Sequence, residues 1–110
     1  MTSPRAAGPG RVRVSVEAVA WMARALGHRA PGRLTLEKTL APGATVADLL
    51  GDLAREHPDF ADYALADDGS LACPHVCVTL NGAVLAIPTD LGRHLRDGDV
   101  VVILPAFAGG

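Results

Sequence analysis

The sequence has few aromatic residues, few cysteines and no long apolar run, and each scarcity excludes a class of protein. Phe, Tyr and Trp make up 4% of the 110 residues and the net charge is -2, so the chain has neither the stacking platform nor the basic surface for nucleic acid. Two cysteines do not build a disulfide framework, which agrees with a reducing compartment. The longest apolar run, 100–108, is too short to span a bilayer, and residues 1–10 lack the apolar core of a signal peptide. We expect a cytoplasmic protein without nucleic-acid or membrane partners.

Length and composition are those of a single domain. Hydrophobic residues make up 49% of the chain and charged residues 20%, which is ordinary for a globular core. The first ten residues are rich in Pro, Gly, Ala and Ser. The sequence predicts a flexible N-terminal segment over 1–10, a folded domain over 11–105 and a flexible C-terminal tail over 106–110.

Alternating polar and apolar residues predict two strands in the first third of the chain. Residues 11–17 alternate, and so do residues 34–38 ahead of a Pro-Gly turn, so the two strands form a hairpin-like unit. Apolar residues between them recur at helical spacing and predict a short turn or helix that Gly27 ends. The buried face of the first strand is predicted to be Val12, Val14 and Val16.

One main helix is predicted over 46–57. Thr45 stands at the N-cap position, where its hydroxyl can accept from the amide of Asp48, whose charge suits the positive end of a helix. Pro58 limits further extension. The apolar face is predicted to consist of Val46, Leu49, Leu50, Leu53 and His57. Residues 60–72 are predicted to be a loop that carries Phe60, Tyr63 and Leu65 onto the core.

The second half of the chain predicts three more strands. Residues 76–80 and 83–87 flank Asn81-Gly82, a strong hairpin signal, and Asp97-Gly98 makes a turn into a strand over 100–104. That last strand is apolar at every position, so both of its faces must be covered. One face meets the helix, and we expect the other to be covered by loops or by another protein.

The sequence ends on two glycines. Because glycine has no Cβ, such a backbone can thread a channel too narrow for side chains, and nothing blocks attack on the terminal carbonyl carbon. From Pro105 to Gly110 an extended arm reaches about 17 Å, enough to enter a buried site. A frayed end that is glycine-rich by chance is the alternative interpretation.

The element order predicts an α+β fold: a mixed five-stranded sheet with one main helix across one face. Within this order, residues 75–82, 95–100 and 103–110 resemble the small subunit of molybdopterin synthase and other ubiquitin-like β-grasp sulfur carriers, and residues 42–50 agree more loosely. The resemblance covers residues 11–110. Residues 104–107 lack the paired prolines common in molybdopterin synthase small subunits and are more similar to cysteine-pathway carriers.

The resemblance implies that the Gly110 carboxylate is the reactive group. A carboxylate is an anion and a poor electrophile, so it must be activated. In this family a ubiquitin-activating-like adenylyltransferase does so with ATP and Mg²⁺, and a sulfurtransferase or cysteine desulfurase supplies the sulfur of a terminal thiocarboxylate. The protein itself then binds no cofactor and is not an enzyme. The partner-binding tail is implied to be Pro105, Ala106, Phe107, Ala108 and Gly109.

Within that tail, the resemblance implies that Gly109, which has no side chain, lets the backbone pass through the partner's channel. It also implies that Phe107 anchors the segment in the partner. A Phe107 ring folded back on the protein's own core is the alternative. Three functions remain open: a sulfur carrier or protein modifier, the small subunit of molybdopterin synthase, and a non-catalytic interaction module. The acceptor is accordingly the large subunit of molybdopterin synthase, a cysteine synthase or another enzyme, and the sequence does not choose between pathways.

Residues 73–77 hold the other candidate group of reactive side chains. In a straight strand Cys73 and Cys77 lie about 13 Å apart, too far for one zinc ion, and the spacing departs from that of zinc fingers. We therefore predict reduced thiols and no metal site. No local motif pairs a cysteine with a histidine as nucleophile and base, and the iron-sulfur form of the β-grasp fold needs four cysteines. The histidines weighed as bases are His28, His57, His75 and His94.

Overall fold

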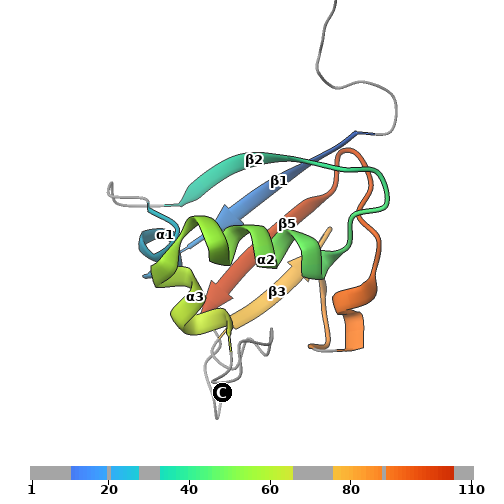
Figure 1. Ribbon diagram of the computed structural model, residues 1–110. Coiled ribbons are helices and arrows are strands. Elements are labelled where there is room, and N and C mark those ends of the chain that lie inside the picture. The colour runs from blue at the N-terminus through green and yellow to red at the C-terminus, as the bar shows by residue number, and fades with distance from the viewer. Residues whose placement is uncertain (1–10, 20, 28–32, 66–75, 88, 106–110) are drawn as a thin grey trace, which may run out of the picture.

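The computed structural model describes residues 11–19, 21–27, 33–65, 76–87 and 89–105, which form a mixed sheet with helices packed on it. The strand order is β2-β1-β5-β3-β4 in one five-stranded sheet. Strands β1 and β5 are parallel, and the other neighbouring pairs are antiparallel. Figure 1 shows α2 lying across one face of this sheet. The predicted α+β class is confirmed. The strands are β1 (Val12–Ala18), β2 (Leu34–Leu40), β3 (Val76–Leu80), β4 (Ala83–Val84) and β5 (Val100–Pro105).

The first two strands pair as the alternating pattern predicts. They are antiparallel, with Val14 opposite Lys38, and β2 runs two residues beyond the predicted end. Between them lies the predicted short helix, α1 (Trp21–Ala25), and Gly27 follows it with φ +90, a conformation that favours glycine. The face of β1 predicted to be buried is confirmed for Val12, Val14 and Val16.

The main helix, α2 (Val46–Glu56), begins at a capping box. Thr45 Oγ1 accepts a hydrogen bond from the Asp48 amide at 3.2 Å, and Asp48 Oδ2 accepts one from the Thr45 amide at 2.9 Å. The helix ends at Glu56, because His57 takes an extended conformation. The predicted cap is confirmed, and four predicted core positions are fully buried: Val46, Leu49, Leu50 and Leu53.

The loop before β5 also holds the N-terminus of α2. The Val46 amide donates to the Arg93 carbonyl at 2.9 Å, and the Leu95 amide donates to the Ala44 carbonyl at 2.9 Å. These two bonds satisfy backbone groups that a helix start and its preceding loop would otherwise leave to water. The segment that leads into the last strand therefore fixes where the main helix begins.

Removing the cap should weaken the fold measurably. We expect Thr45→Ala to lower the free energy of unfolding by about 1 kcal/mol, because the Asp48 amide loses its acceptor. Urea denaturation followed by circular dichroism measures this. Thr39→Ala, the same change at an exposed position of the edge strand β2, is the control and should have a smaller effect. Equal losses in the two variants would contradict the capping role.

A third helix, α3 (Pro58–Ala64), replaces part of the predicted loop. The prediction of a loop from residue 60 was wrong because Pro58, which limits α2, occupies the first turn of the next helix, where its missing N–H costs nothing. Phe60 is fully buried, as expected, whereas Tyr63 is 37% exposed. Leu65, just after the helix, packs partly buried against the core.

The strand predicted over 83–87 is only two residues long, Ala83–Val84. Both backbone groups of Ala86 are used locally. Its amide donates to Asp90 Oδ2 at 2.8 Å, and its carbonyl accepts from the Asp90 amide at 2.6 Å. The last hydrogen bond to β3 runs from the Leu85 amide to the Val78 carbonyl at 2.9 Å, and after it the Ala86–Asp90 bonds turn the chain into a 3-10 helix, η1 (Thr89–Gly92).

Candidate functional site: the end of β5 and the open face of the sheet

Strand β5 holds the point from which the terminal segment leaves the domain. It lies in the middle of the sheet, and Ile103 is paired with Ala18 of β1 on one side and Val78 of β3 on the other. Pro105, the last residue of β5, stands opposite Val76. Residues 106–110 lie outside the described part of the chain. The roles given to Ala106, Phe107, Ala108, Gly109 and Gly110 therefore stay predictions.

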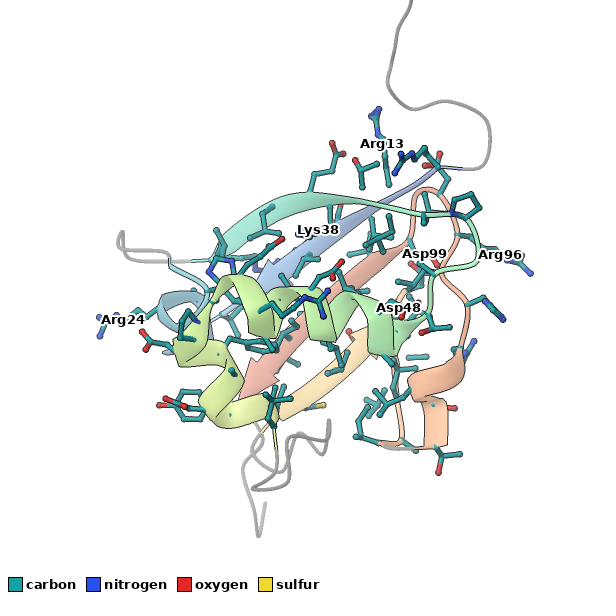
Figure 2. All side chains as sticks on the ribbon, in the orientation of Figure 1. Arg13, Arg24, Lys38, Asp48, Arg96 and Asp99 are labelled. Atoms are coloured by element: carbon teal, nitrogen blue, oxygen red, sulfur yellow. The ribbon has the colours of Figure 1, made fainter. Side chains whose placement is uncertain are left out.

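The start of β5 is fixed by a network of side-chain hydrogen bonds. Asn81 Nδ2 donates to Asp99 Oδ1 at 2.9 Å, and the Val100 amide donates to Asn81 Oδ1 at 2.9 Å. The Arg96 amide donates to Asp99 Oδ2 at 2.8 Å. Asn81 has φ 51, the left-handed conformation that the predicted Asn-Gly turn requires. Figure 2 shows Asp99 near this end of the sheet. The network joins the β3–β4 turn to the first residue of β5.

The Asp97-Gly98 turn joins the same end of the sheet to β1. Asp97 Oδ1 accepts from the Arg13 amide at 2.8 Å, and the Gly98 amide donates to the Arg13 carbonyl at 2.8 Å. Gly98 has φ +90, so the predicted turn is confirmed. Both neighbours of β5 are thus tied to the segment that leads into it.

The two faces of β5 have different surroundings. Val101 and Ile103 are 0% exposed and belong to the core beneath the helices. Because side chains alternate along a strand, Val100, Val102 and Leu104 point to the opposite face, and each is only half-buried. The expectation that one face of this strand meets the helix is confirmed. The other face keeps part of its apolar surface exposed.

Five residues form a continuous group on that other face. The register places Leu104 beside Cys77 and Val102 beside Thr79, and Thr79 is in turn opposite Val84. Val84 is 70% exposed, although it is one of the larger apolar side chains. We call this group the open-face patch: Cys77, Thr79, Val84, Val102 and Leu104.

Charged side chains border the open-face patch on the β1 and β2 side. Glu17 is the register partner of Val102 and forms an ion pair with Arg33 at 2.9 Å. Arg13 and Glu37 approach to 4.0 Å on the same face. An apolar centre beside a polar rim is the usual composition of a surface that binds another protein.

An ion pair lies on the helix side of the sheet and was not predicted. Lys38 of β2 extends to Glu56, the last residue of α2, and its Nζ lies 2.7 Å from both carboxylate oxygens. This hydrogen bond lowers the pKa of Glu56 below its ordinary value, so the carboxylate is charged at neutral pH. Figure 2 shows Lys38 on β2, where α2 crosses the sheet.

The candidate thiols and histidines do not gather into a second site within the described residues. Cys73, His75 and His28 lie outside those residues, and Cys77 is a half-buried free thiol in the open-face patch. No three histidine, cysteine or carboxylate side chains come together for a metal ion in the described part. His94 Nδ1 lies 2.9 Å from the Gly43 carbonyl, which places that ring beside the loop before α2.

A hollow of about 390 Å³ lies between the end of β2 and the flank of α2. Its charged residues already have partners: Arg55 pairs with Asp52, and Asp48 caps the helix. None of its lining residues belongs to the open-face patch or to β5.

Within the described residues, every helix is too short or too polar to span a membrane.

A mixed sheet with its last strand in the centre and one main helix across it is the ubiquitin-like β-grasp fold, the fold of small carrier and modifier proteins. The chain belongs to the ThiS family, whose model matches residues 28–110. This confirms the resemblance to the β-grasp sulfur carriers. The family consists of carriers and modifiers that are not themselves catalytic.

Three known proteins show how similar the chain is to its relatives. Small archaeal modifier protein 3 of Haloferax volcanii is 39% identical over 67 residues, which cover 61% of this chain and 71% of that protein. The solution structure of the Haloferax volcanii HVO 2177 protein superposes with a TM-score of 0.73 at 26% identity, over 99% of this chain and 100% of that one. A putative molybdopterin converting factor, subunit 1, from Pyrococcus furiosus superposes with a TM-score of 0.63 at 25% identity, over 87% and 99%.

Proposed function

We propose that this protein is a cytoplasmic sulfur carrier. Its terminal Gly110 carboxylate is activated by a partner enzyme and converted to a thiocarboxylate, which then donates sulfur. One observation carries the proposal: the segment that ends in Gly109-Gly110 starts from the central strand of a β-grasp sheet in a ThiS-family chain. A strand paired on both sides gives the segment a fixed origin. Only the residues after Pro105 then need to enter a partner's site.

The chemistry follows from the weakness of a carboxylate as an electrophile. A ubiquitin-activating-like partner with ATP and Mg²⁺ joins AMP to the Gly110 carboxylate and releases pyrophosphate. A sulfur nucleophile, from a sulfurtransferase or a cysteine desulfurase, then attacks the carbonyl carbon, and AMP leaves. When the nucleophile is sulfide, the product is the thiocarboxylate directly. When it is a persulfide, a second thiol must cleave the sulfur-sulfur bond and is oxidised to a disulfide.

The open-face patch is the proposed docking surface for the activating partner. Strand β5 supplies Val102 and Leu104 to the patch, and Leu104 directly precedes Pro105, from which the terminal segment starts. A partner seated on this patch therefore holds the domain beside the segment it must act on. The pairing of β5 with both neighbours keeps patch and segment origin in one rigid unit.

The direct test is the intact mass of the purified protein after incubation with ATP, Mg²⁺, the cognate activating enzyme and sulfide. The proposed function predicts a gain equal to the mass difference between sulfur and oxygen, located at Gly110 by fragmentation. The same incubation without ATP is the control and should give no gain. If the mass stays unchanged although the activating enzyme is shown to be active, the proposal is refuted.

A charge in the open-face patch should impair activation without unfolding the domain. We expect Val84→Asp to slow thiocarboxylate formation at least about tenfold, because an unpaired carboxylate would be desolvated at the interface. Val84 is 70% exposed, so the melting temperature should change little. Ala83→Asp is the matched control: Ala83 is also exposed, precedes Val84 in β4 and pairs with Leu80, a residue of the core-facing side. Equal rates for the two variants would contradict docking at the patch.

Two related functions differ in the acceptor to which the activated protein transfers its sulfur or its carboxyl end. Similarity to small archaeal modifier protein 3 favours a modifier, whose carboxyl end would be joined to lysines of other proteins. Similarity to a molybdopterin converting factor subunit favours a carrier that works within an enzyme complex with a large subunit. Co-purification identifies the acceptor: a molybdopterin synthase large subunit or a cysteine synthase supports the carrier, and lysine conjugates support the modifier.

A further inference from the structure

The sequence contains a single lysine, Lys38, beside nine arginines. Apart from the amino terminus of the chain, Nζ of Lys38 is the one primary amine that could attack an activated carboxyl end. Arginine does not compete, because its guanidinium stays protonated under all ordinary conditions. Whether one copy of this protein can be joined to another by an isopeptide bond to a side chain thus depends on the surroundings of one residue.

The stem of Lys38 is packed on the helix side of β2. Lys38 alternates with Leu36 and Leu40, which both contact the core, and its register partner is the fully buried Val14. A lysine in such a position buries its methylene stem and sends only its charged end outward. The side chain is 17% exposed. Because so little of the side chain is exposed, few directions remain from which a carbonyl carbon can come within about 3 to 3.5 Å of Nζ, the distance that reaction requires.

The charged end of Lys38 is held by Glu56. Nζ lies 2.7 Å from both carboxylate oxygens, and Glu56 is the last residue of α2. The C-terminal end of a helix is itself favourable for a cation. To act as a nucleophile, Nζ must lose a proton and with it this ion pair, since an ammonium has no lone pair to donate.

We propose that this packing withholds Lys38 as an acceptor, so the activated end of one copy is not transferred to the lysine of the next. The inference rests on the proposed function. The withheld reaction is attack of Nζ on the Gly110 carbonyl carbon of an acyl-adenylate, forming a carbon-nitrogen bond, breaking the carbon-oxygen bond to AMP and releasing a proton. Without it, activated copies stay available for sulfide or for an external acceptor.

Acylation by a small reagent tests the shielding without any activating enzyme. An Arg96→Lys variant carries a second lysine at an exposed position and serves as its own reference. With acetyl N-hydroxysuccinimide ester, peptide mass spectrometry should show Lys38 acetylated on the order of tenfold more slowly than position 96, because limited exposure and the ion pair act together. Equal rates at the two positions in the folded protein would overturn the proposal. In denaturant the two rates should converge.

A pair of charge variants isolates the part played by Glu56. Glu56→Gln should raise the acetylation rate of Lys38 about two- to five-fold, the factor expected for one partly exposed ion pair. Glu37→Gln removes the same charge from the neighbouring residue of β2, on the opposite face, and should leave the rate unchanged. A Glu56→Gln rate equal to that of the wild type would overturn the role given to Glu56.

A second experiment, with ATP and the activating enzyme, compares Lys38 with a lysine at position 96 as acceptors of the activated Gly110 carboxyl group. The Arg96→Lys protein should form dimers linked from Gly110 to position 96, whereas the wild type should form none through Lys38. A Gly110–Lys38 isopeptide in the wild type would refute the inference. Failure of the proposed function looks different, since no adenylate or thiocarboxylate would then appear on Gly110 in the intact mass. In that event the acetylation rates still test the shielding of Lys38.

Discussion

Deleting Gly110, or appending one residue after it, is expected to abolish the sulfur-dependent mass gain completely. Without Gly110 the carboxylate moves to Gly109 and the segment is shorter by about 3.3 to 3.6 Å, so the carbonyl no longer reaches the attacked position. An appended residue places a side chain where the proposed channel admits only backbone. Intact mass spectrometry after incubation with ATP, activating enzyme and sulfide measures the loss.

The fold itself should tolerate these changes. The core cluster of the described residues extends along the chain only to Ile103, well before the altered positions. The melting temperature of both variants should therefore stay within the spread expected of surface changes. Ala106→Ser, a small change inside the same segment that leaves its length and end intact, is the matched control and should retain the mass gain. A variant with an appended residue that still accepted sulfur would refute the assignment of Gly110.

The largest effect on stability is expected for Phe60→Ala. Phe60 is the largest of the fully buried side chains in the described residues. Its removal loses the transfer free energy of the ring and leaves a cavity, which together should lower the free energy of unfolding by about 3 to 5 kcal/mol. Since small domains are stable by only about 5 to 15 kcal/mol, the variant should be marginal at 37 °C. Urea denaturation monitored by circular dichroism gives the difference.

Asp62→Ala supplies the control for this prediction. Asp62 lies in the same short helix, α3, but is exposed. Its replacement should change the free energy of unfolding by less than about 0.5 kcal/mol. If Phe60→Ala cost as little as Asp62→Ala, α3 would not be a packed part of the domain.

The sequence predicts the elements whose pattern is local. Thr45 and Asp48 are three residues apart and form the capping box by themselves, and the Asn81-Gly82 turn needs only its own two residues. The pattern is misleading where one residue has two interpretations. Pro58 limits one helix and starts the next, so α3 was predicted to be a loop although Phe60 and Ala64 have helical spacing.

Features made by distant segments could not be predicted from the sequence alone. The partner of Lys38 is Glu56, 18 residues away on another element. The alternation of Lys38 with Leu36 and Leu40 does place the lysine on the core-facing side of its strand. The sequence therefore predicts which face of the strand carries Lys38, but it does not predict that Glu56 is its ion-pair partner.

The central place of β5 also governs when a newly made chain becomes usable. Before β5 is available, no strand pairing can join the β1–β2 pair to the β3–β4 pair, because β5 is the strand that lies between β1 and β3. The unfinished chain therefore exposes separate strand edges and cannot close its core. An activating enzyme that recognises the folded domain would meet only chains synthesised at least through residue 105, so incomplete products would escape adenylation.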